Sequence, residues 1–316
     1  MLNSYKESLK LIKEAHYILI VTHLNPDADT ISSALALSNF MFENKIKHKV
    51  FNSSKDIPRG LNFLARFDKI TDQIPKFYDL VIYVDCADMQ RVGIEIIDDV
   101  KIINIDHHQS NNNFGDINIV DSSKASNAEV LYGFFEHNNL QLSKNIASCL
   151  YVGIYDDSIA FTTPRTSEDT FRIIKNLVET GISPSDIANN LLRRDSLARY
   201  RILPKILETL ELHSEGKIAT VYLDNNWIVQ TGASTNECDD VVNMVLNIAI
   251  VECIAYFRVI NGKVRVSLRS KNDMDVSNIA KNFNGGGHKN AAGLSVNTNI
   301  IEDAKRKVLE VINKNL

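Results

Sequence analysis

The sequence predicts an α/β protein of two domains, the first of them built around a parallel sheet. Three short runs, 17–21 (YILIV), 80–84 (LVIYV) and 102–105 (IINI), are apolar throughout and rich in β-branched residues, as buried parallel strands are. The stretches between them are long enough for crossover helices. From Lys217 the apolar residues alternate with polar ones, which is typical of half-buried strands. A chain of 316 residues has room for both domains.

The first domain opens with elements that fit a doubly wound sheet. Residues 1–23 predict an amphipathic helix followed by the first strand, and residues 30–43 predict the next helix. The apolar stripe of that helix consists of Ala34, Leu35, Leu37 and Phe40. Strands that alternate with helices indicate a doubly wound α/β sheet. Such sheets bind ligands at the carboxyl ends of their strands, so the residues after each strand are the first candidates for a site.

A helical connector is expected between the two domains. Ser183 fits the N-cap of a helix and Pro184 its first residue. The charged stretch that follows has few glycines, and we predict a helical linker over 186–213. The boundaries that follow are 1–185 for the first domain and 214–316 for the second.

The second domain is expected to be a smaller α/β unit. Its strands are predicted at 217–223, 251–259 and 263–269, where apolar and polar residues alternate. The last two strands are separated by Asn261-Gly262, the dipeptide that favours a tight hairpin turn.

The overall composition argues against several classes of protein. A net charge of -4, with both signs interspersed, does not fit a protein that coats long duplex nucleic acid. No signal peptide and no apolar run of about 18 residues is present, so we expect a cytoplasmic protein without membrane contact. No C-x-x-C pair occurs, which argues against a zinc–thiolate site and favours a reducing compartment. The cysteines are Cys86, Cys149, Cys238 and Cys253.

Residues suited to metal chemistry follow all three strands of the first domain. The first strand leads into His23, Asp27 and Asp29, and the second leads into Asp85. Two like carboxylates that face one cavity repel each other unless a cation lies between them. Taken singly, these residues also fit a polar turn or helix caps. Their recurrence at successive strand ends favours a common site.

The third strand leads into Asp106-His107-His108. Adjacent side chains on an extended backbone point to opposite faces, so we expect one histidine to bind metal and the other to contact substrate. Asp106 can orient a histidine through its second ring nitrogen. The simpler alternative is a solvent-exposed turn.

A further carboxylate pair, Asp156-Asp157, ends the apolar helical stretch 146–155. Carboxylates are unfavourable at a helix C-terminus because of the helix dipole, which favours a functional role over a simple turn. Mixed oxygen and imidazole ligation suits Mn²⁺, with Mg²⁺, Fe²⁺ or Co²⁺ as substitutes. Two such ions would activate a water and stabilise the leaving oxygen of a phosphate ester.

The second domain contains a glycine-rich segment, Asn284–Gly293 (NGGGHKNAAG). The backbone of Gly285, Gly286 and Gly287 can approach an anion closely, and His288 adds a donor. The Ala-Ala pair after it suggests a helix or a tight turn. The alternative is a flexible loop.

Two arginines precede this segment on a predicted strand. Arg265 and Arg269 lie on the same face of that strand, and arginine binds phosphate through two parallel hydrogen bonds. Solvated strand charges are the alternative. No Walker-type phosphate loop is present, so an ATP-binding loop is not expected.

Taken together, the motifs resemble the DHH phosphoesterase superfamily over nearly the whole chain. The N-terminal motifs are His23-x-x-x-Asp27-x-Asp29, Val84-Asp85, Asp106-His107-His108 and the Asp157 segment. Ser267–Ser270 and Gly285–Gly293 resemble the DHH-associated C-terminal domain. The compact size is similar to that of the NrnA-like branch of nanoRNases and 3′-phosphoadenosine-5′-phosphate phosphatases. Manganese pyrophosphatases share the N-terminal motifs but lack the glycine-rich segment.

The resemblance implies a role for each matching residue. One ion would be held by His23, Asp27 and Asp85, and the other by Asp29, Asp85, His107 and Asp157, with Asp85 bridging. Asp85, Asp106 and His108 would serve catalysis, and His108 would contact the scissile phosphate. The remaining substrate contacts would lie across the cleft between the two domains and come from Arg265, Arg269, Gly285, Gly286, Gly287 and His288.

The chain departs from the family pattern at two places. Asp157-Ser158-Ile159 stands where the family often has Asp-Thr-Gly, so a hydroxyl is kept and a glycine is lost. The segment Ala125–Glu129 is a looser match to the Ser-Thr-Ser-Glu pattern of the branch.

The resemblance implies a manganese-dependent enzyme that hydrolyses very short RNAs, and also 3′-phosphoadenosine-5′-phosphate. Hydrolysis of cyclic dinucleotides or their linear products (pApA, pGpG) is an alternative. A non-catalytic nucleotide sensor is an alternative of another class. The family also suggests a homodimer.

Overall fold

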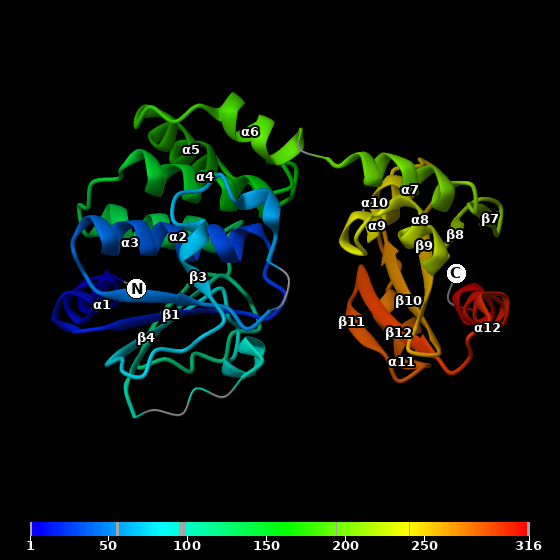
Figure 1. Ribbon diagram of the computed structural model, residues 1–316, viewed down its shortest axis with the longest axis horizontal. Helices are drawn as coiled ribbons and strands as arrows, with labels where there is room; N and C mark the ends of the chain where they lie inside the picture. The colour runs from blue at the N-terminus through cyan, green and yellow to red at the C-terminus, as the bar shows by residue number, and fades with distance from the viewer. Residues whose placement is uncertain are drawn as a thin grey trace. The chain divides into compact units, whose positions relative to one another are not determined.

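A computed structural model describes residues 2–54, 57–94, 96, 99–193, 195–239 and 241–314, apart from the side chains of Leu2, Arg59, Asn236 and His288. Its backbone divides into two compact units, Met1–Arg194 and Asp195–Leu316, each described here by itself (Figure 1). Within the described residues, none of the helices combines the length and apolar composition that a membrane crossing requires. The four cysteines are free and buried.

The first unit is built on a six-stranded sheet in the order β3-β2-β1-β4-β5-β6, in which every pairing is parallel. The three strands predicted from apolar runs are all present, as β1, β4 and β5. The strands are β1 (Ile18–Thr22), β2 (His48–Phe51), β3 (Ile70–Thr71), β4 (Leu80–Val84), β5 (Lys101–Asp106) and β6 (Ile117–Val120). From β1 the chain builds the sheet outward through β2 and β3, and it then continues from β4 in the opposite direction. Doubly wound sheets bind ligands at the carboxyl ends of the strands beside such a switch point.

The long helices lie on one side of this sheet. They are α1 (Leu2–Glu14), α2 (Ala28–Glu43), α3 (Asn127–His137), α4 (Lys144–Asp157), α5 (Glu168–Glu179) and α6 (Pro184–Leu192). Of these, α1, α2 and α3 contact the strands, α4 packs on α2 and α3, and α5 packs on α4. The other face packs against shorter segments that include η3 (Met89–Val92), so the long helices of this sheet are not shared between its two faces. The two remaining short helices are η1 (Arg59–Leu61) and η2 (Phe67–Lys69). Ser183 caps α6 and Pro184 begins it, as predicted.

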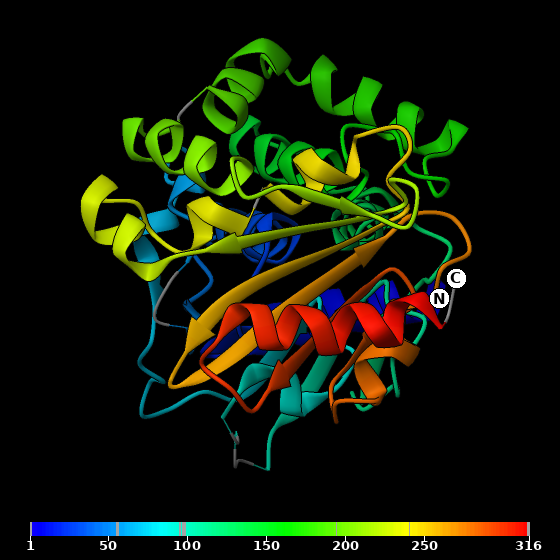
Figure 2. The ribbon, with the colours of Figure 1, turned by 90° about the vertical axis from the view of Figure 1, so that its right-hand side faces the viewer.

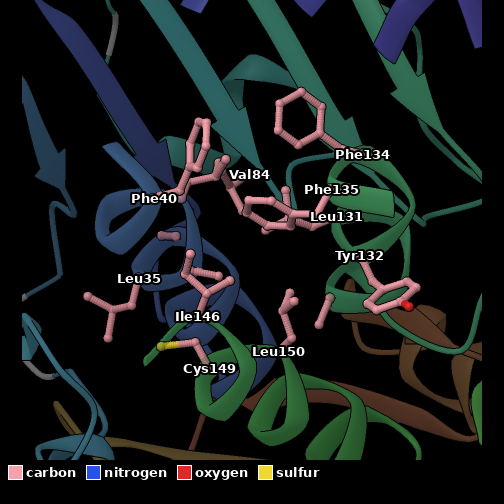
Figure 3. Packing of buried hydrophobic residues seen from close by; sticks show 14 of the residues in the cluster. Leu35, Phe40, Val84, Leu131, Tyr132, Phe134, Phe135, Ile146, Cys149 and Leu150 are labelled. Atoms are coloured by element: carbon pink, nitrogen blue, oxygen red, sulfur yellow. The ribbon is translucent and has the colours of Figure 1, made fainter. Parts of the chain in front are cut away.

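The main core of the first unit lies between the sheet and the helices α2 and α3, and it continues between these helices and α4 (Figure 3). Phe40 of α2 packs edge-on against Phe135 of α3, with ring centroids 5.5 Å apart. Such aromatic contacts add to the stabilisation that burial provides. This packing fixes the N-terminus of α2 and the C-terminus of α4 against the ends of the strands, where the candidate site lies.

The second unit contains another six-stranded sheet, in the order β11-β12-β10-β9-β8-β7. Its strands are β7 (Glu211–His213), β8 (Ile218–Leu223), β9 (Cys253–Ile260), β10 (Lys263–Ser270), β11 (Gly286–His288) and β12 (Ala291–Val296). The predicted hairpin joins β9 to β10, and both Asn261 and Gly262 have positive φ, as a two-residue hairpin loop requires. The Ala-Ala pair lies in β12, so the suggestion of a helix or tight turn there was wrong.

Helices cover both faces of the second sheet (Figure 2). Apolar residues of α12 (Ile301–Asn313) and α11 (Val276–Lys281) pack on one face. The other face is covered by α7 (Leu197–Leu207), α8 (Asn225–Thr231), α9 (Asn236–Asp239) and α10 (Val241–Leu246). The stretch 186–213 is therefore divided between the two units. The end of α6 belongs to the first unit, whereas α7 packs on the second sheet and β7 pairs with β8 there.

Candidate metal centre

Neighbouring strands and two helix ends bring the predicted ligands to one edge of the first sheet. His23 follows β1, Asp85 follows β4, and His107 follows β5. Because these three strands are adjacent in the sheet, their carboxyl ends lie side by side. The N-terminus of α2 adds Asp27 and Asp29, and the last residue of α4 is Asp157.

The ligand-type atoms gather into three overlapping groups, in each of which they lie within 4.8 Å of one another. These groups are His23, Asp27 and Asp85; Asp29, His107 and Asp157; and Asp85, His107 and His108. All six residues predicted as metal ligands therefore lie together, and His108 joins them.

Asp85 links the groups through its two carboxylate oxygens. Its Oδ2 lies 3.5 Å from Nε2 of His23, and its Oδ1 lies 3.6 Å from Nε2 of His107. The same His107 nitrogen is 3.5 Å from Oδ2 of Asp157. These separations are too long for hydrogen bonds, but two ligands of one ion bound at about 2 Å each are separated by about this distance. The arrangement fits a carboxylate that bridges two ions.

The backbone at Asp85 is in the left-handed region, with a φ of 59°. Aspartate tolerates this conformation better than most residues, and such conformations concentrate at functional sites. The amide of Asp85 donates to the carbonyl of Ile105 at 2.9 Å, so the turn remains tied to the neighbouring strand.

Thr30, which the sequence analysis did not single out, lies at the centre of the first group. Its hydroxyl oxygen is 2.7 Å from Nε2 of His23, 2.8 Å from Oδ1 of Asp27 and 2.5 Å from Oδ2 of Asp85. Nδ1 of His23 faces the carbonyl of Leu24 at 2.9 Å, which leaves Nε2 as the acceptor in the neutral ring. One hydroxyl proton cannot satisfy three acceptors, whereas a cation can.

The carboxylates of the site are buried close to one another, so a bound cation would stabilise their charged forms. Burial, reinforced by the charge of Asp85, raises the pKa of Asp29 well above its usual value. Burial, together with the charges of Asp27 and Asp85, raises the pKa of Asp157 to about 7. Oδ1 of Asp85 is buried without a hydrogen-bond partner among the described residues. The donor set and these unmet charges fit divalent metal ions.

The sequence analysis expected the two adjacent histidines to point apart, and this was wrong. His107 and His108 follow the end of β5 rather than lying within it, and their rings meet at a centroid distance of 4.8 Å. Nδ1 of His108 lies 3.5 Å from Oδ1 of Asp85, the same oxygen that faces His107. The strand rule for alternating faces does not apply beyond the strand end.

Asp106 orients His108. Oδ1 of Asp106 accepts a hydrogen bond from Nδ1 of His108 at 2.7 Å, and Oδ2 accepts one from the amide of Asn111 at 2.6 Å. The hydrogen bond to Asp106 is the main reason that the pKa of His108 is raised. Nε2 of His108 lies 3.4 Å from Nη1 of Arg91. The ring is thus fixed and partly exposed, as a group that donates to a phosphate oxygen needs to be.

Asp29 is positioned by the N-terminus of α3. Its carboxylate accepts hydrogen bonds from the backbone amides of Asn127 at 2.6 Å and Ala128 at 3.0 Å. Both residues belong to the segment Ala125–Glu129, which only loosely matches the family pattern. Because the donors are backbone amides, these hydrogen bonds do not depend on which side chains the segment carries. Gly153 of α4 lies against the same carboxylate, and a Cβ there would be 2.5 Å from Oδ1 of Asp29.

The hydroxyl of Ser158, at the end of α4, accepts a hydrogen bond from the amide of Phe161 at 2.9 Å. Ile159, at the position where the family often has glycine, adopts a left-handed φ of 49°. The segment therefore keeps a conformation that favours glycine although the glycine itself is absent.

In the second unit, Arg265 and Arg269 lie on the face of β10 opposite to the buried Val266 and Leu268. Arg269 pairs in register with Ala291 of β12, which pairs with His288 of β11. The side chain of His288 lies outside the described residues. The expectation that these residues face the metal ligands across a cleft stays a prediction.

Gly286 and Gly287 of this segment lie in the edge strand β11, and Gly285 directly precedes it. A Cβ on Gly287, which has a φ of 148°, would collide with the carbonyl oxygen of Ala291. A Cβ on Gly285 would collide in the same way with the carbonyl oxygen of Gly293. Both positions therefore need glycine for the close approach of two strands, and Gly286 has open space around its Cα.

A parallel α/β sheet with carboxylates and imidazoles grouped around a shared aspartate defines a class of metal-dependent hydrolases. The chain belongs to the DHH family of phosphoesterases. The family model for the N-terminal DHH domain matches residues 17–154, and that for the DHHA1 domain matches residues 215–316.

Several curated relatives align with nearly the whole chain. A probable bifunctional oligoribonuclease and PAP phosphatase of Streptococcus mutans is 30% identical, with 96% of this chain and 99% of the relative covered. The bifunctional oligoribonuclease and PAP phosphatase NrnA of Thermus thermophilus is 28% identical, with 99% and 95% covered. The NrnA of Bacillus subtilis is 27% identical, with 92% of each chain covered.

Among solved structures, an exopolyphosphatase-related protein from Bacteroides fragilis has the same fold. It superposes with a TM-score of 0.92 at 24% identity and covers 99% of this chain and 96% of its own.

Proposed function

We propose that the protein is a manganese-dependent phosphoesterase that hydrolyses RNAs of about two to five nucleotides to mononucleotides. We propose that it also converts 3′-phosphoadenosine-5′-phosphate to AMP. The observation that supports this most directly is Asp85, whose two oxygens face two separate groups of ligand atoms. The names of the relatives from three bacteria support the substrates.

In this proposal the side chains of the first unit divide the work. Six residues hold two ions: His23, Asp27, Asp29, Asp85, His107 and Asp157. Bound divalent ions supply charge neutralisation and activate a water. His108 in its imidazolium form, which Asp106 favours by raising the pKa of the ring, donates from Nε2 to a non-bridging oxygen of the scissile phosphate while Nδ1 donates to Asp106.

The second unit is proposed to bind the part of the substrate that does not react. On β10, Arg265 is exposed and Arg269 is half-buried, and both are cations. The backbone of Gly286 and Gly287 can approach an anion closely, whereas the amide of Gly285 already donates to the carbonyl of Ala280 at 2.9 Å. Replacing Arg269 with Gln is expected to raise KM for a dinucleotide while leaving Mn²⁺ affinity unchanged, as steady-state kinetics and calorimetry would show. A change in Mn²⁺ affinity would instead place Arg269 in the metal site.

The first test is a substrate panel with metal-stripped protein, added Mn²⁺ and chromatographic product analysis. The panel contains a 5′-phosphorylated RNA dinucleotide, a 24-mer RNA, 3′-phosphoadenosine-5′-phosphate, cyclic di-AMP and pyrophosphate. Rapid hydrolysis of the dinucleotide with the long RNA nearly untouched supports the proposal. Preferential loss of cyclic di-AMP moves the substrate to cyclic dinucleotides, and nucleotide binding without any turnover indicates a sensor.

The matched variants are Asp85→Ala and Asp303→Asn. Asp85→Ala removes the shared ligand and should abolish turnover while the circular dichroism spectrum stays unchanged. Asp303 lies on the exposed surface of α12, so Asp303→Asn should keep full activity. Retained activity in Asp85→Ala would refute the metal assignment.

A further inference from the structure

One wall of the cleft beside the candidate metal ligands is formed by the loop between α4 and α5. The cleft has a volume of about 450 Å³, and His107, His108 and Asp157 line it together with Thr163, Pro164 and Arg165. Among the described residues that line it, Arg165 is the one with a permanent positive charge.

The first half of this loop is anchored to the end of α4. The amides of Thr162 and Thr163 both donate to the carbonyl of Ser158, at 2.9 and 3.1 Å. The ring of Phe161 packs edge-on against the ring of Tyr155, with centroids 5.7 Å apart. These contacts hold the left-handed bend that begins at Ile159.

The second half of the loop is a closed turn that presents Arg165. The amide of Thr166 donates to the carbonyl of Thr163 at 3.0 Å, which places Pro164 and Arg165 at the two central positions. Proline at the first central position fixes its φ and stiffens the turn. The backbone of Arg165 is therefore held in place before a ligand binds.

The guanidinium of Arg165 has no hydrogen bond or ion pair to any residue that the structure describes. Arg172, a little further along the chain, is by contrast paired with both Asp169 and Glu136. The donors of Arg165 therefore remain available at a cleft that Asp157 and the two histidines also line.

We propose that Arg165 binds a second phosphate of the substrate, one that is not hydrolysed. This inference rests on the proposed function, because it concerns another group of the same substrate. A terminal phosphate carries about two negative charges near neutral pH, and the guanidinium of Arg165 would compensate part of that charge. A 5′-phosphorylated dinucleotide and 3′-phosphoadenosine-5′-phosphate both carry a 5′-phosphate besides the ester that is cleaved.

The test compares two RNA dinucleotides that differ only in the 5′-phosphate. Arg165→Gln should lower kcat/KM for the phosphorylated dinucleotide by about ten- to a hundredfold, mainly through KM, because charge-assisted hydrogen bonds are lost. For the unphosphorylated dinucleotide the change should stay below about twofold. Arg165→Lys should recover part of the loss. Arg306→Gln, which removes a charge from exposed α12, should behave as the unaltered protein.

Equal losses on both dinucleotides, or no loss on either, would overturn the role of Arg165. Calorimetry gives a readout that does not depend on turnover: the Mn²⁺-loaded protein should bind 5′-AMP more tightly than adenosine, and Arg165→Gln should reduce that preference by about tenfold or more. If the unaltered protein hydrolyses neither dinucleotide, the proposed function fails, while the calorimetric comparison still decides the role of Arg165. Equal binding of 5′-AMP and adenosine by the unaltered protein would contradict it.

Discussion

At the scale of single residues, the site is a set of like charges gathered where water is largely excluded. Asp29 and Asp85 are 1% and 2% exposed, and burial alone would favour their neutral forms. Burial would raise the pKa of Asp85, but its contact with His23 and the charges of His107 and His108 hold that pKa below its usual value. Asp85 thus stays ionised more readily than Asp29, which suits a carboxylate that two ions would share.

Thr30→Val tests whether the hydroxyl stands in for a cation in the metal-free protein. Loss of a buried hydrogen bond to charged groups should lower the free energy of unfolding of the metal-free protein by about 1–3 kcal/mol. With Mn²⁺ bound the loss should be smaller, since the ion then satisfies the three acceptors. Urea unfolding with and without Mn²⁺ measures both values, and Thr30→Ser is the control that keeps the hydroxyl. An equal loss in the two states would contradict this account.

The raised pKa of Asp157 predicts how Mn²⁺ binding depends on pH. Because that pKa is raised to about 7, the stability that Asp157 contributes to the metal-free protein is present at low pH and is lost as the pH rises through about 7. A metal ligand must be deprotonated, so Mn²⁺ competes with this proton below pH 7. Apparent Mn²⁺ affinity should therefore rise about tenfold from pH 6 to pH 8. In Asp157→Asn, Mn²⁺ affinity should rise less between pH 6 and pH 8. A calorimetric Mn²⁺ affinity that does not change with pH in the unaltered protein would contradict the prediction.

At the scale of elements, helix ends position the carboxylates. Asp27 caps α2 by accepting from the amide of Thr30, Asp29 accepts from the N-terminus of α3, and Asp157 ends α4. Helix N-termini favour negative charge, whereas a C-terminus does not. The unfavourable position of Asp157 is consistent with its raised pKa and with a role in binding a cation.

Gly153→Ala tests the packing of α4 against Asp29. The added Cβ would lie 2.5 Å from Oδ1 of Asp29 and 2.7 Å from the Cβ of Ala128, so these groups must shift. We expect the free energy of unfolding to fall by about 1–3 kcal/mol and Mn²⁺ affinity to fall with it. Gly60→Ala is the control, because an added Cβ at Gly60 would meet no heavy atom within 4 Å. Unchanged Mn²⁺ affinity in Gly153→Ala would show that Asp29 is not a ligand.

At the scale of the whole molecule, each unit has its own apolar cores. The first unit buries two clusters on the two faces of its sheet, and the second unit does the same. All candidate metal ligands belong to the first unit, whereas Arg265, Arg269 and the glycine segment belong to the second. In the proposals above, the first unit therefore provides the metal ligands and Arg165, and the second unit provides the remaining contacts to the substrate.

A fragment of residues 1–194 should fold and bind Mn²⁺ with an affinity within about twofold of that of the full chain, because distant sites act independently. The same fragment should lose most of its affinity for a short RNA. Calorimetry with Mn²⁺ and with a dinucleotide measures the two effects. A large fall in Mn²⁺ affinity on truncation would show that the second unit supplies a ligand.

The sequence alone predicted the fold class, the strands β1, β4, β5, β8, β9 and β10, and the six candidate ligands that the structure brings close together. These predictions succeeded because they rest on local signals: apolar runs, alternation, the Asn-Gly turn and polar residues directly after strands. Only the tertiary structure revealed the position of Thr30, the convergence of His107 with His108, the support that α3 and Gly153 give to Asp29, and the place of Arg165 in the cleft. These features depend on which segments pack together across long sequence separations, and no local pattern of residues specifies that packing.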